Sequence, residues 1–242
     1  YGIYLKEADG VTINKNNIFN IIDNNTNMGR INAILLSTGV QNCNITKNNI
    51  YNVYAKSSSN SLGASGIEIN TGNPNSFIAI VNNSIGRINN ERGISVPMYL
   101  TTSGISVLGT SGGIKIYNNS ICVAGNNTSS ASVNISEGIY FAPGVTGIEL
   151  INNSFYNSTL FTKSVSKSYA IYSEAFASAF TQINYNNYYV TGSQAVLGYL
   201  GGDKTTLEDW KTATGKDGNS ISVDPLNLND NNLQPVVASP LV

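Results

Sequence analysis

A short pattern of apolar and polar residues recurs along the chain. Each copy has an apolar residue, two variable positions, an asparagine, one further position and a second apolar residue. The copies are INKNNI (13–18), ITKNNI (45–50), IVNNSI (80–85), IYNNSI (116–121), LINNSF (150–155) and INYNNY (183–188). Copies at such near-constant spacing indicate a repeat protein. The fixed asparagines are Asn16, Asn48, Asn83, Asn119, Asn153 and Asn186.

A second pattern precedes each copy by about ten residues. A small residue is followed by an apolar, a variable and usually another apolar residue, and this alternation predicts a short strand. The segments are GIYL (2–5), AILL (33–36), GIEI (66–69), GISV (104–107), GIYF (138–141) and AIYS (170–173). A weaker third strand follows the asparagine in some copies, as in IFNI (18–21), IYNV (50–53) and ICVA (121–124).

These units predict a parallel β-solenoid with one repeat per coil. One unit is too small to bury its own apolar residues, but stacked units share a continuous core. No helical period runs between the strands, which excludes leucine-rich and doubly wound α/β folds. We expect about six to seven coils over residues 1–198 and a cap of the same domain over 199–242. The spacers, rich in Ser, Asn, Thr and Gly, should project from one edge of the column.

The recurring asparagine is expected to lie at a bend between two strands. Asparagine tolerates left-handed backbone conformations and bonds to neighbouring backbone groups. Its amide can both donate and accept, so stacked asparagines are predicted to form a ladder from coil to coil. The second asparagine of each pair is interpreted as exposed turn chemistry.

The repeat stops near residue 199, and TTLEDWKTATG predicts a short helix at about 205–214. Thr205 and Glu208 fit a capping box, and Gly215 suits the end of the helix. The last coil of a solenoid exposes an open core that natural proteins cover. Leu207 and Trp210 are therefore predicted to cap the last coil.

The composition narrows the range of functions. Charged residues make up 11% of the chain, the net charge is −1 and histidine is absent. Nucleic acids require a basic surface, and imidazole chemistry requires histidine. No apolar run is long enough to span a membrane, so we expect no membrane insertion. The two cysteines, Cys43 and Cys122, are expected to be buried free thiols.

Candidate site residues are few. The outward row of the first strand contains Glu68, interpreted mainly as a solvated residue, and the neighbours Tyr140 and Tyr172, a candidate platform for stacking sugars. A rival site, for catalysis, lies on the segment 86–103, where Arg87, Glu91 and Arg92 are expected to gather near the row of Glu68. Paired-carboxylate hydrolysis needs two suitably spaced acids, and no second acid shares the row of Glu68. The sequence predicts no metal site and no cofactor.

The C-terminal sequence resembles a known family. The run W-x-x-x-T-G-x-D-x-x-S-x-x-x-D-P followed by L-x-P-x-x-x-S-P is similar to the end of β-helix domains in secreted and cell-surface bacterial proteins, especially from Bacteroidetes. The matching residues are Trp210, Thr214, Gly215, Asp217, Ser220, Asp224, Pro225, Leu233, Pro235, Ser239 and Pro240. The resemblance implies a right-handed parallel β-helix of the pectate-lyase-like superfamily.

Two functions remain open at this point. We expect a non-catalytic extracellular module, adhesive, structural or glycan-contacting, that belongs to a larger secreted or surface-anchored bacterial protein. The alternative is a polysaccharide lyase or glycoside hydrolase that acts on an extended glycan along the outer sheet. The expected partners are a polysaccharide or another surface protein, together with adjoining domains of the same polypeptide upstream and downstream. No nucleic acid is expected among them.

Overall fold

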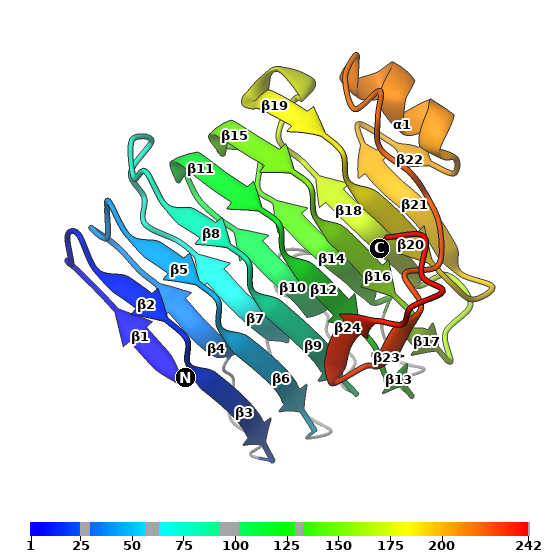
Figure 1. The fold of residues 1–242 in the computed structure, drawn as a ribbon, viewed down its shortest axis with the longest axis horizontal. Coiled ribbons are helices and arrows are strands. Elements are labelled where there is room, and N and C mark those ends of the chain that lie inside the picture. The colour runs from blue at the N-terminus through cyan, green and yellow to red at the C-terminus, as the bar shows by residue number, and fades with distance from the viewer. Residues whose placement is uncertain (25–29, 57–62, 92–101, 129–132, 242) are drawn as a thin grey trace.

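The computed structural model describes residues 1–24, 30–56, 63–91, 102–128 and 133–241. In this part the chain winds into an all-β parallel solenoid, as predicted. Three sheets run along the column, and successive coils contribute neighbouring strands to each sheet (Figure 1). The column has about five turns, slightly fewer than the six to seven coils expected.

Each coil contributes one strand to each of three sheets. Sheet 1 contains β1 (Ile3–Leu5), β4 (Ile31–Leu36), β7 (Ala64–Ile69), β10 (Thr102–Val107), β14 (Ile135–Phe141), β18 (Lys167–Ser173), β21 (Ala195–Leu200) and the antiparallel β22 (Asp203–Lys204). Sheet 2 contains β2 (Thr12–Asn14), β5 (Asn44–Thr46), β8 (Ala79–Val81), β11 (Gly112–Tyr117), β15 (Thr146–Ile151) and β19 (Phe180–Asn184). Sheet 3 contains β3 (Asn17–Asp23), β6 (Asn49–Ala55), β9 (Ser84–Asn90), β12 (Ser120–Val123), β16 (Ser154–Asn157) and β20 (Asn187–Val190).

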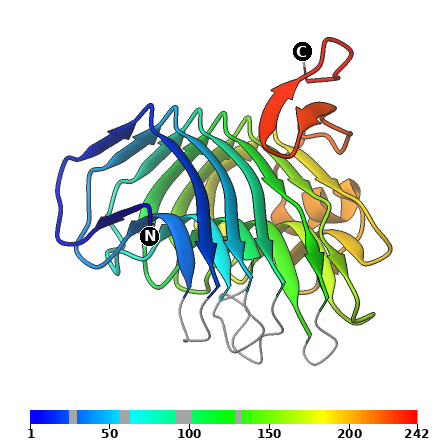
Figure 2. The same cartoon turned by 90° about the horizontal axis from the view of Figure 1, so that it is seen from below.

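Smaller elements complete the described chain. They are the pair β13 (Asn126–Asn127) and β17 (Leu160–Phe161), the short 3-10 helix η2 (Ala177–Ala179), the helix α1 (Leu207–Thr214) and the hairpin of β23 (Asn227–Asn229) and β24 (Asn232–Pro235). Figure 2 shows the coils side by side and the C-terminal hairpin outside them.

The apolar positions of the repeat form the core. Ile116 in β11 pairs with Ile80 in the preceding coil and Leu150 in the following one, and all three are fully buried. Ile121 in β12 pairs with Ile85 and Phe155 in the same way. Burial of one such side chain stabilises the fold by about 1.5–3 kcal/mol. The repeat therefore stabilises the column through the same contacts in every coil.

The ladder asparagine lies at the bend between sheets 2 and 3, as predicted, but it does not itself have the left-handed backbone conformation. The left-handed residue precedes the ladder asparagine, with φ between 55° and 58° at Lys15, Lys47, Asn82, Asn118, Asn152 and Tyr185. Ladder asparagines are absent from the residues with positive φ in the described chain. The second asparagines are exposed as interpreted, except Asn187, which is buried.

The asparagine ladder is present in all six copies. The Oδ1 atom of Asn119 accepts from the backbone N–H and the side-chain amide of Asn83, at 2.9 and 3.0 Å. The same double contact joins each ladder asparagine to the next, from Asn16 to Asn186. Within the column each amide also donates to a backbone carbonyl of the preceding coil, as Asn119 does to Ile80 at 2.8 Å. The ladder thus satisfies buried amides that would otherwise destabilise the fold.

The C-terminal segment closes the last coil. Trp210 of α1 is fully buried against the rings of Phe180 and Tyr188, with centroids 6.4 and 5.9 Å away, and Leu207 is partly buried against the same core. The capping box is formed by Thr206 and Asp209, one residue later than the predicted Thr205 and Glu208. The Thr206 hydroxyl oxygen accepts from the backbone N–H of Asp209, and the Asp209 carboxylate accepts from the backbone N–H of Thr206.

A buried carboxylate joins the helix to the end of the ladder. Asp217 accepts hydrogen bonds from Trp210 Nε1 at 2.8 Å, from the Tyr188 hydroxyl at 2.7 Å and from the Ser220 hydroxyl. Ser220 Oγ in turn accepts from the backbone N–H of Asn186 at 2.7 Å. Ser220 therefore takes the place of the next ladder asparagine, which accounts for the Trp, Asp and Ser of the C-terminal motif.

Beyond the cap, the chain turns back along the outside of sheet 3. The hairpin of β23 and β24 contacts β9 and β12, several coils before the cap (Figure 1). Leu233 is buried against Cys122, Ala124 and Tyr156. Cys43 and Cys122 are both buried free thiols, as predicted.

Candidate functional site

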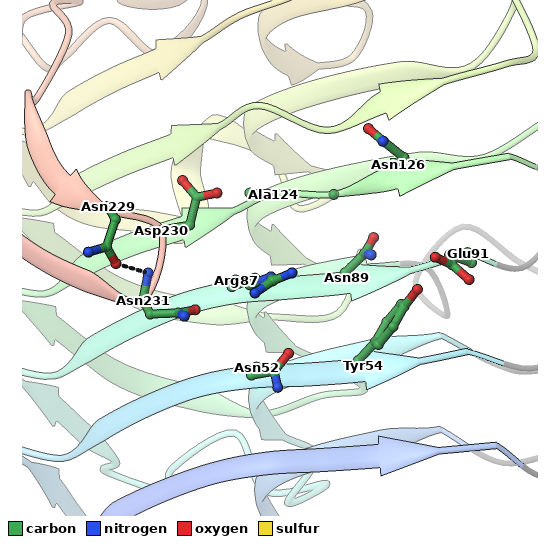
Figure 3. Close-up of a pocket in the computed structure, with 11 residues that line it drawn as sticks. Asn52, Tyr54, Arg87, Asn89, Glu91, Ala124, Asn126, Asn229, Asp230 and Asn231 are labelled. Carbon is green, nitrogen blue, oxygen red and sulfur yellow. Dashed lines mark hydrogen bonds between the residues drawn. The ribbon is translucent and has the colours of Figure 1, made fainter.

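The returning hairpin forms one wall of a polar groove on sheet 3. The groove has a volume of about 510 Å³ and is lined by strands of three consecutive coils and by the turn of the hairpin. We call it the Arg87 groove (Figure 3). Its lining residues are Asn52, Tyr54, Arg87, Asn89, Glu91, Ala124, Gly125, Asn126, Asn229, Asp230 and Asn231.

A β-bulge presents Arg87 to the groove. Ile85 pairs with Ile121 and Ile88 pairs with Val123, so two residues of β9 oppose one residue of β12. Arg87 has a left-handed backbone with φ of 50° and an exposed side chain. Bulges of this kind re-aim a side chain and are common beside functional sites. Within the described part of the chain, no ion pair is found for the Arg87 guanidinium.

Tyr54 and Glu91 form a hydrogen-bonded pair at one end of the groove. Tyr54 lies in β6, and its side chain points toward Glu91, which follows β9 (Figure 3). Burial, followed by this hydrogen bond and the negative charge of Glu91, raises the pKa of Tyr54 well above its ordinary value. The hydroxyl therefore stays protonated and acts as a donor at neutral pH.

Asp230 lies on the other side of Arg87, in the turn of the hairpin (Figure 3). Its Oδ1 atom is 3.6 Å from the thiol of Cys122 in β12. Burial and the nearby Asp230 charge raise the pKa of Cys122, so the thiol stays protonated and unreactive. The backbone oxygen of Asp230 also lies against Gly86, where a Cβ would approach it to 2.2 Å. These contacts fix the hairpin against the strands.

Two residues that line the groove carry a buried amide oxygen for which the described part of the chain provides no hydrogen-bond donor. Among the described residues, Asn89 Oδ1 and Asn231 Oδ1 are buried without a partner. A buried acceptor without a donor costs about 1–3 kcal/mol, and such groups are rare enough to require an explanation. A ligand with hydroxyl groups would supply the missing donors only if these side chains turned their oxygens into the groove.

The chemistry of the groove is suited to binding polar ligands. It combines a guanidinium, two carboxylates, a tyrosine hydroxyl and several amides, which together donate and accept hydrogen bonds in many directions. Among the described residues, no group of three His, Cys, Asp or Glu side chains could hold a metal ion. No described helix is long and apolar enough to cross a membrane.

Glu68 does not join this groove. It lies on the outer face of sheet 1, whereas Glu91 follows β9 of sheet 3. The interpretation of Glu68 as a solvated residue is wrong, because the residue is only 6% exposed and pairs with the buried Arg30, with Nε 2.9 Å from its Oε2. Arg30 also donates to Ser106 Oγ at 3.2 Å. The pair stabilises the covered face of sheet 1.

The candidate platform of Tyr140 and Tyr172 is buried as well. The two residues are 0% and 2% exposed, and their ring centroids lie 6.0 Å apart. The Tyr140 hydroxyl donates to Glu174, and the ring of Tyr172 stacks on Tyr199 at 4.2 Å. These rings stabilise sheet 1 and present no open face to a sugar.

The rival catalytic segment is placed only in part. Arg87 and Glu91 both line the groove, as the rival site grouped them, but on sheet 3 and away from Glu68, while Arg92 lies outside the described residues. Sequence reasoning missed Tyr54 and Asp230. The stretch DPLNLNDNN (224–232) is acidic and rich in asparagine, but nothing in its spacing indicates that it lies over sheet 3.

Comparison with protein-family models, with curated proteins and with solved structures gives no match to this chain.

Proposed function

We propose that the chain is a non-catalytic, carbohydrate-contacting β-helix module of a secreted or surface-anchored bacterial protein. The observation that carries the proposal is the Arg87 groove, where the Asn89 and Asn231 oxygens find no donor among the described residues. Sugar hydroxyls donate and accept at once, so they can donate to these oxygens and also accept from the exposed guanidinium of Arg87. The groove crosses several coils, which suits an extended glycan.

The resemblance of the C-terminal sequence supports the cellular context. Secreted and cell-surface β-helix domains of the pectate-lyase-like superfamily end in a similar motif, and the parallel β-helix of this chain agrees with that likeness. A low-charge surface rich in asparagine, serine and threonine also fits contact with polysaccharide.

A glycoside hydrolase or polysaccharide lyase is the second candidate. It is favoured by the presence of Arg87, Glu91 and Asp230 in one groove. General acid–base catalysis needs a group that exchanges its proton near the working pH. The raised pKa keeps the Tyr54 hydroxyl protonated, so no tyrosinate is available as a base near neutral pH, and the hydroxyl lies against Glu91. Binding without turnover therefore agrees better with the groove.

Titration calorimetry with neutral and acidic oligosaccharides tests the proposal. Arg87→Ala should weaken binding about tenfold to hundredfold, because a charged hydrogen bond contributes about 1.5–3 kcal/mol. Lys115→Ala, which removes an exposed cation on sheet 2, is the matched control and should bind like the parent chain. Equal affinity of Arg87→Ala and the parent chain would contradict the proposed site.

Product analysis separates the two candidates. The chain is incubated with the same oligosaccharides, and reducing ends and unsaturated uronates are measured. No product is expected. Product formation that Glu91→Gln abolishes would replace the binding module with the enzyme.

A further inference from the structure

Two stacked aromatic rings lie on the outer face of sheet 3, near the Arg87 groove. Phe19 of β3 and Tyr51 of β6 occupy paired positions. Their ring centroids are 5.1 Å apart, with only 4° between the ring planes. Phe19 is 45% exposed, in contrast to the buried tyrosines of sheet 1. Sheet 3 therefore carries the accessible aromatic pair that was expected on sheet 1.

The next position in this row has no side chain. Tyr51 pairs with Gly86 of β9, so no side chain in register covers the second face of the Tyr51 ring. The absence of a Cβ at Gly86 allows the hairpin backbone at Asp230 to lie against β9. The hairpin therefore occupies the position next to the two rings in the direction of the following coil.

A second groove lies between Tyr51 and the hairpin. It has a volume of about 820 Å³, and we call it the Tyr51 groove. Lys47 and Tyr51 line it from the strand side, and Gln234 lines it from the hairpin side. Asn229 and Asn231 line both this groove and the Arg87 groove, so the two grooves meet at the turn of the hairpin.

We infer that the Tyr51 groove binds one pyranose unit of a neutral, linear glycan, with the sugar ring against the part of the Tyr51 ring that lines the groove. The face of an aromatic ring carries partial negative charge, and the C–H bonds on a pyranose face carry partial positive charge. Amides at the rim supply hydrogen bonds to the hydroxyl groups, as in other ligand sites where a few polar groups fix orientation. The inference rests on the proposed function, since the same glycan continues into the Arg87 groove.

The charges of the two grooves favour a neutral ligand. Their lining includes two cations, Lys47 and Arg87, and two carboxylates, Glu91 and Asp230, so the formal charges cancel. A polyanionic glycan would meet both carboxylates of the Arg87 groove, and like charges at close range disfavour binding. A neutral glycan meets no such repulsion.

Titration calorimetry with hexasaccharides of β-linked glucose, xylose and mannose, and with a galacturonate hexamer, tests the inference. Tyr51→Ala should weaken binding of the preferred neutral hexamer at least about tenfold, as expected for an aromatic anchor. Tyr51→Phe should keep the affinity, because the ring and not the hydroxyl makes the contact. Phe176→Ala removes a ring that is 77% exposed and lines neither groove, so it should not change binding.

The outcomes distinguish this inference from the proposed function. Binding that Arg87→Ala weakens and Tyr51→Ala leaves unchanged would overturn the Tyr51 subsite alone. Tighter binding of the galacturonate hexamer than of every neutral one would overturn the neutral ligand class. No binding of any hexamer would overturn both proposals. Trp210 fluorescence checks folding, and Tyr51→Leu, which keeps apolar volume without a ring, should show the same loss as Tyr51→Ala.

Discussion

Substitution of Asn119 by alanine removes one rung from the middle of the asparagine ladder. Its Oδ1 atom is the acceptor for the backbone N–H and the amide of Asn83, and its Nδ2 atom donates to Ile80, Tyr117 and Asn153. Alanine leaves the buried backbone N–H of Asn83 without this acceptor, at a cost of about 1–3 kcal/mol. The net loss of the other bonds adds about 1 kcal/mol. We therefore expect unfolding free energy to fall by about 2–4 kcal/mol.

Urea unfolding measures this loss, followed both by Trp210 fluorescence and by circular dichroism. Coincident transitions show that a single free energy describes the unfolding. Asn16→Ala is the matched control, because Asn16 lies in the first coil and its amide only donates among the described residues. It should cost less than about 1 kcal/mol.

Replacement by serine tests the acceptor itself. Ser220 already accepts from the Asn186 N–H at the end of the ladder, so Asn119→Ser should lose less stability than Asn119→Ala. The ladder reasoning is refuted if Asn119→Ala costs no more than Asn16→Ala.

Three further predictions concern packing, the cap and the helix. Gly104→Ala should destabilise the fold by about 1–3 kcal/mol, because its Cβ would lie 2.2 Å from a buried isoleucine methyl group. Gly218→Ala is the control, because the space around Gly218 is open. Equal melting temperatures of the two variants would contradict the argument. Asp217→Asn replaces one of two acceptor oxygens by an NH2 group, which cannot accept from Trp210, Tyr188 or Ser220. The substitution should lower the melting temperature and shift Trp210 emission. If both stayed unchanged, the carboxylate would not be the centre of the cap. Hydrogen bonds from the helix N-cap lower the pKa of Asp209 in the folded chain below the ordinary value of 3.8. The carboxylate therefore stabilises the fold fully above pH 3.8, and this stabilisation is lost as the pH falls through the folded-state pKa. An NMR titration midpoint of Asp209 at or above 3.8 would disprove this.

The fold of the column could be predicted because the same pattern of apolar residues and asparagine recurs in every coil. Ile116, Asn119 and Ile121 each have counterparts in five other copies, so register and burial follow from the pattern alone. The capping residue Trp210 was recognisable because it follows the last copy and has a helix signal around it.

Arg87 and Glu91 were grouped from the sequence, but the rest of the groove could not be predicted, because its parts occur once and lie far apart in the sequence. Asp230 reaches β9 only because the chain turns back after the cap, and Gly86 permits that contact without any local signal. The outward position of Glu68 was predicted correctly, but its burial was missed for a similar reason, since its partner Arg30 precedes the strand of another coil. Alternation in a strand predicts which side chains face outward, but not whether another segment covers them.

The ladder also has an evolutionary consequence. Each ladder asparagine presents the same donors and the same acceptor to its neighbours, and the Ser220 hydroxyl accepts the backbone hydrogen bond of the last ladder asparagine. Duplication or deletion of one whole repeat in the gene would leave every remaining rung bonded, whereas loss of a few residues would shift one coil out of register. The ladder therefore permits the column to change length in single-coil steps, but only coils before β9 can be gained or lost without moving the hairpin from its place against Gly86.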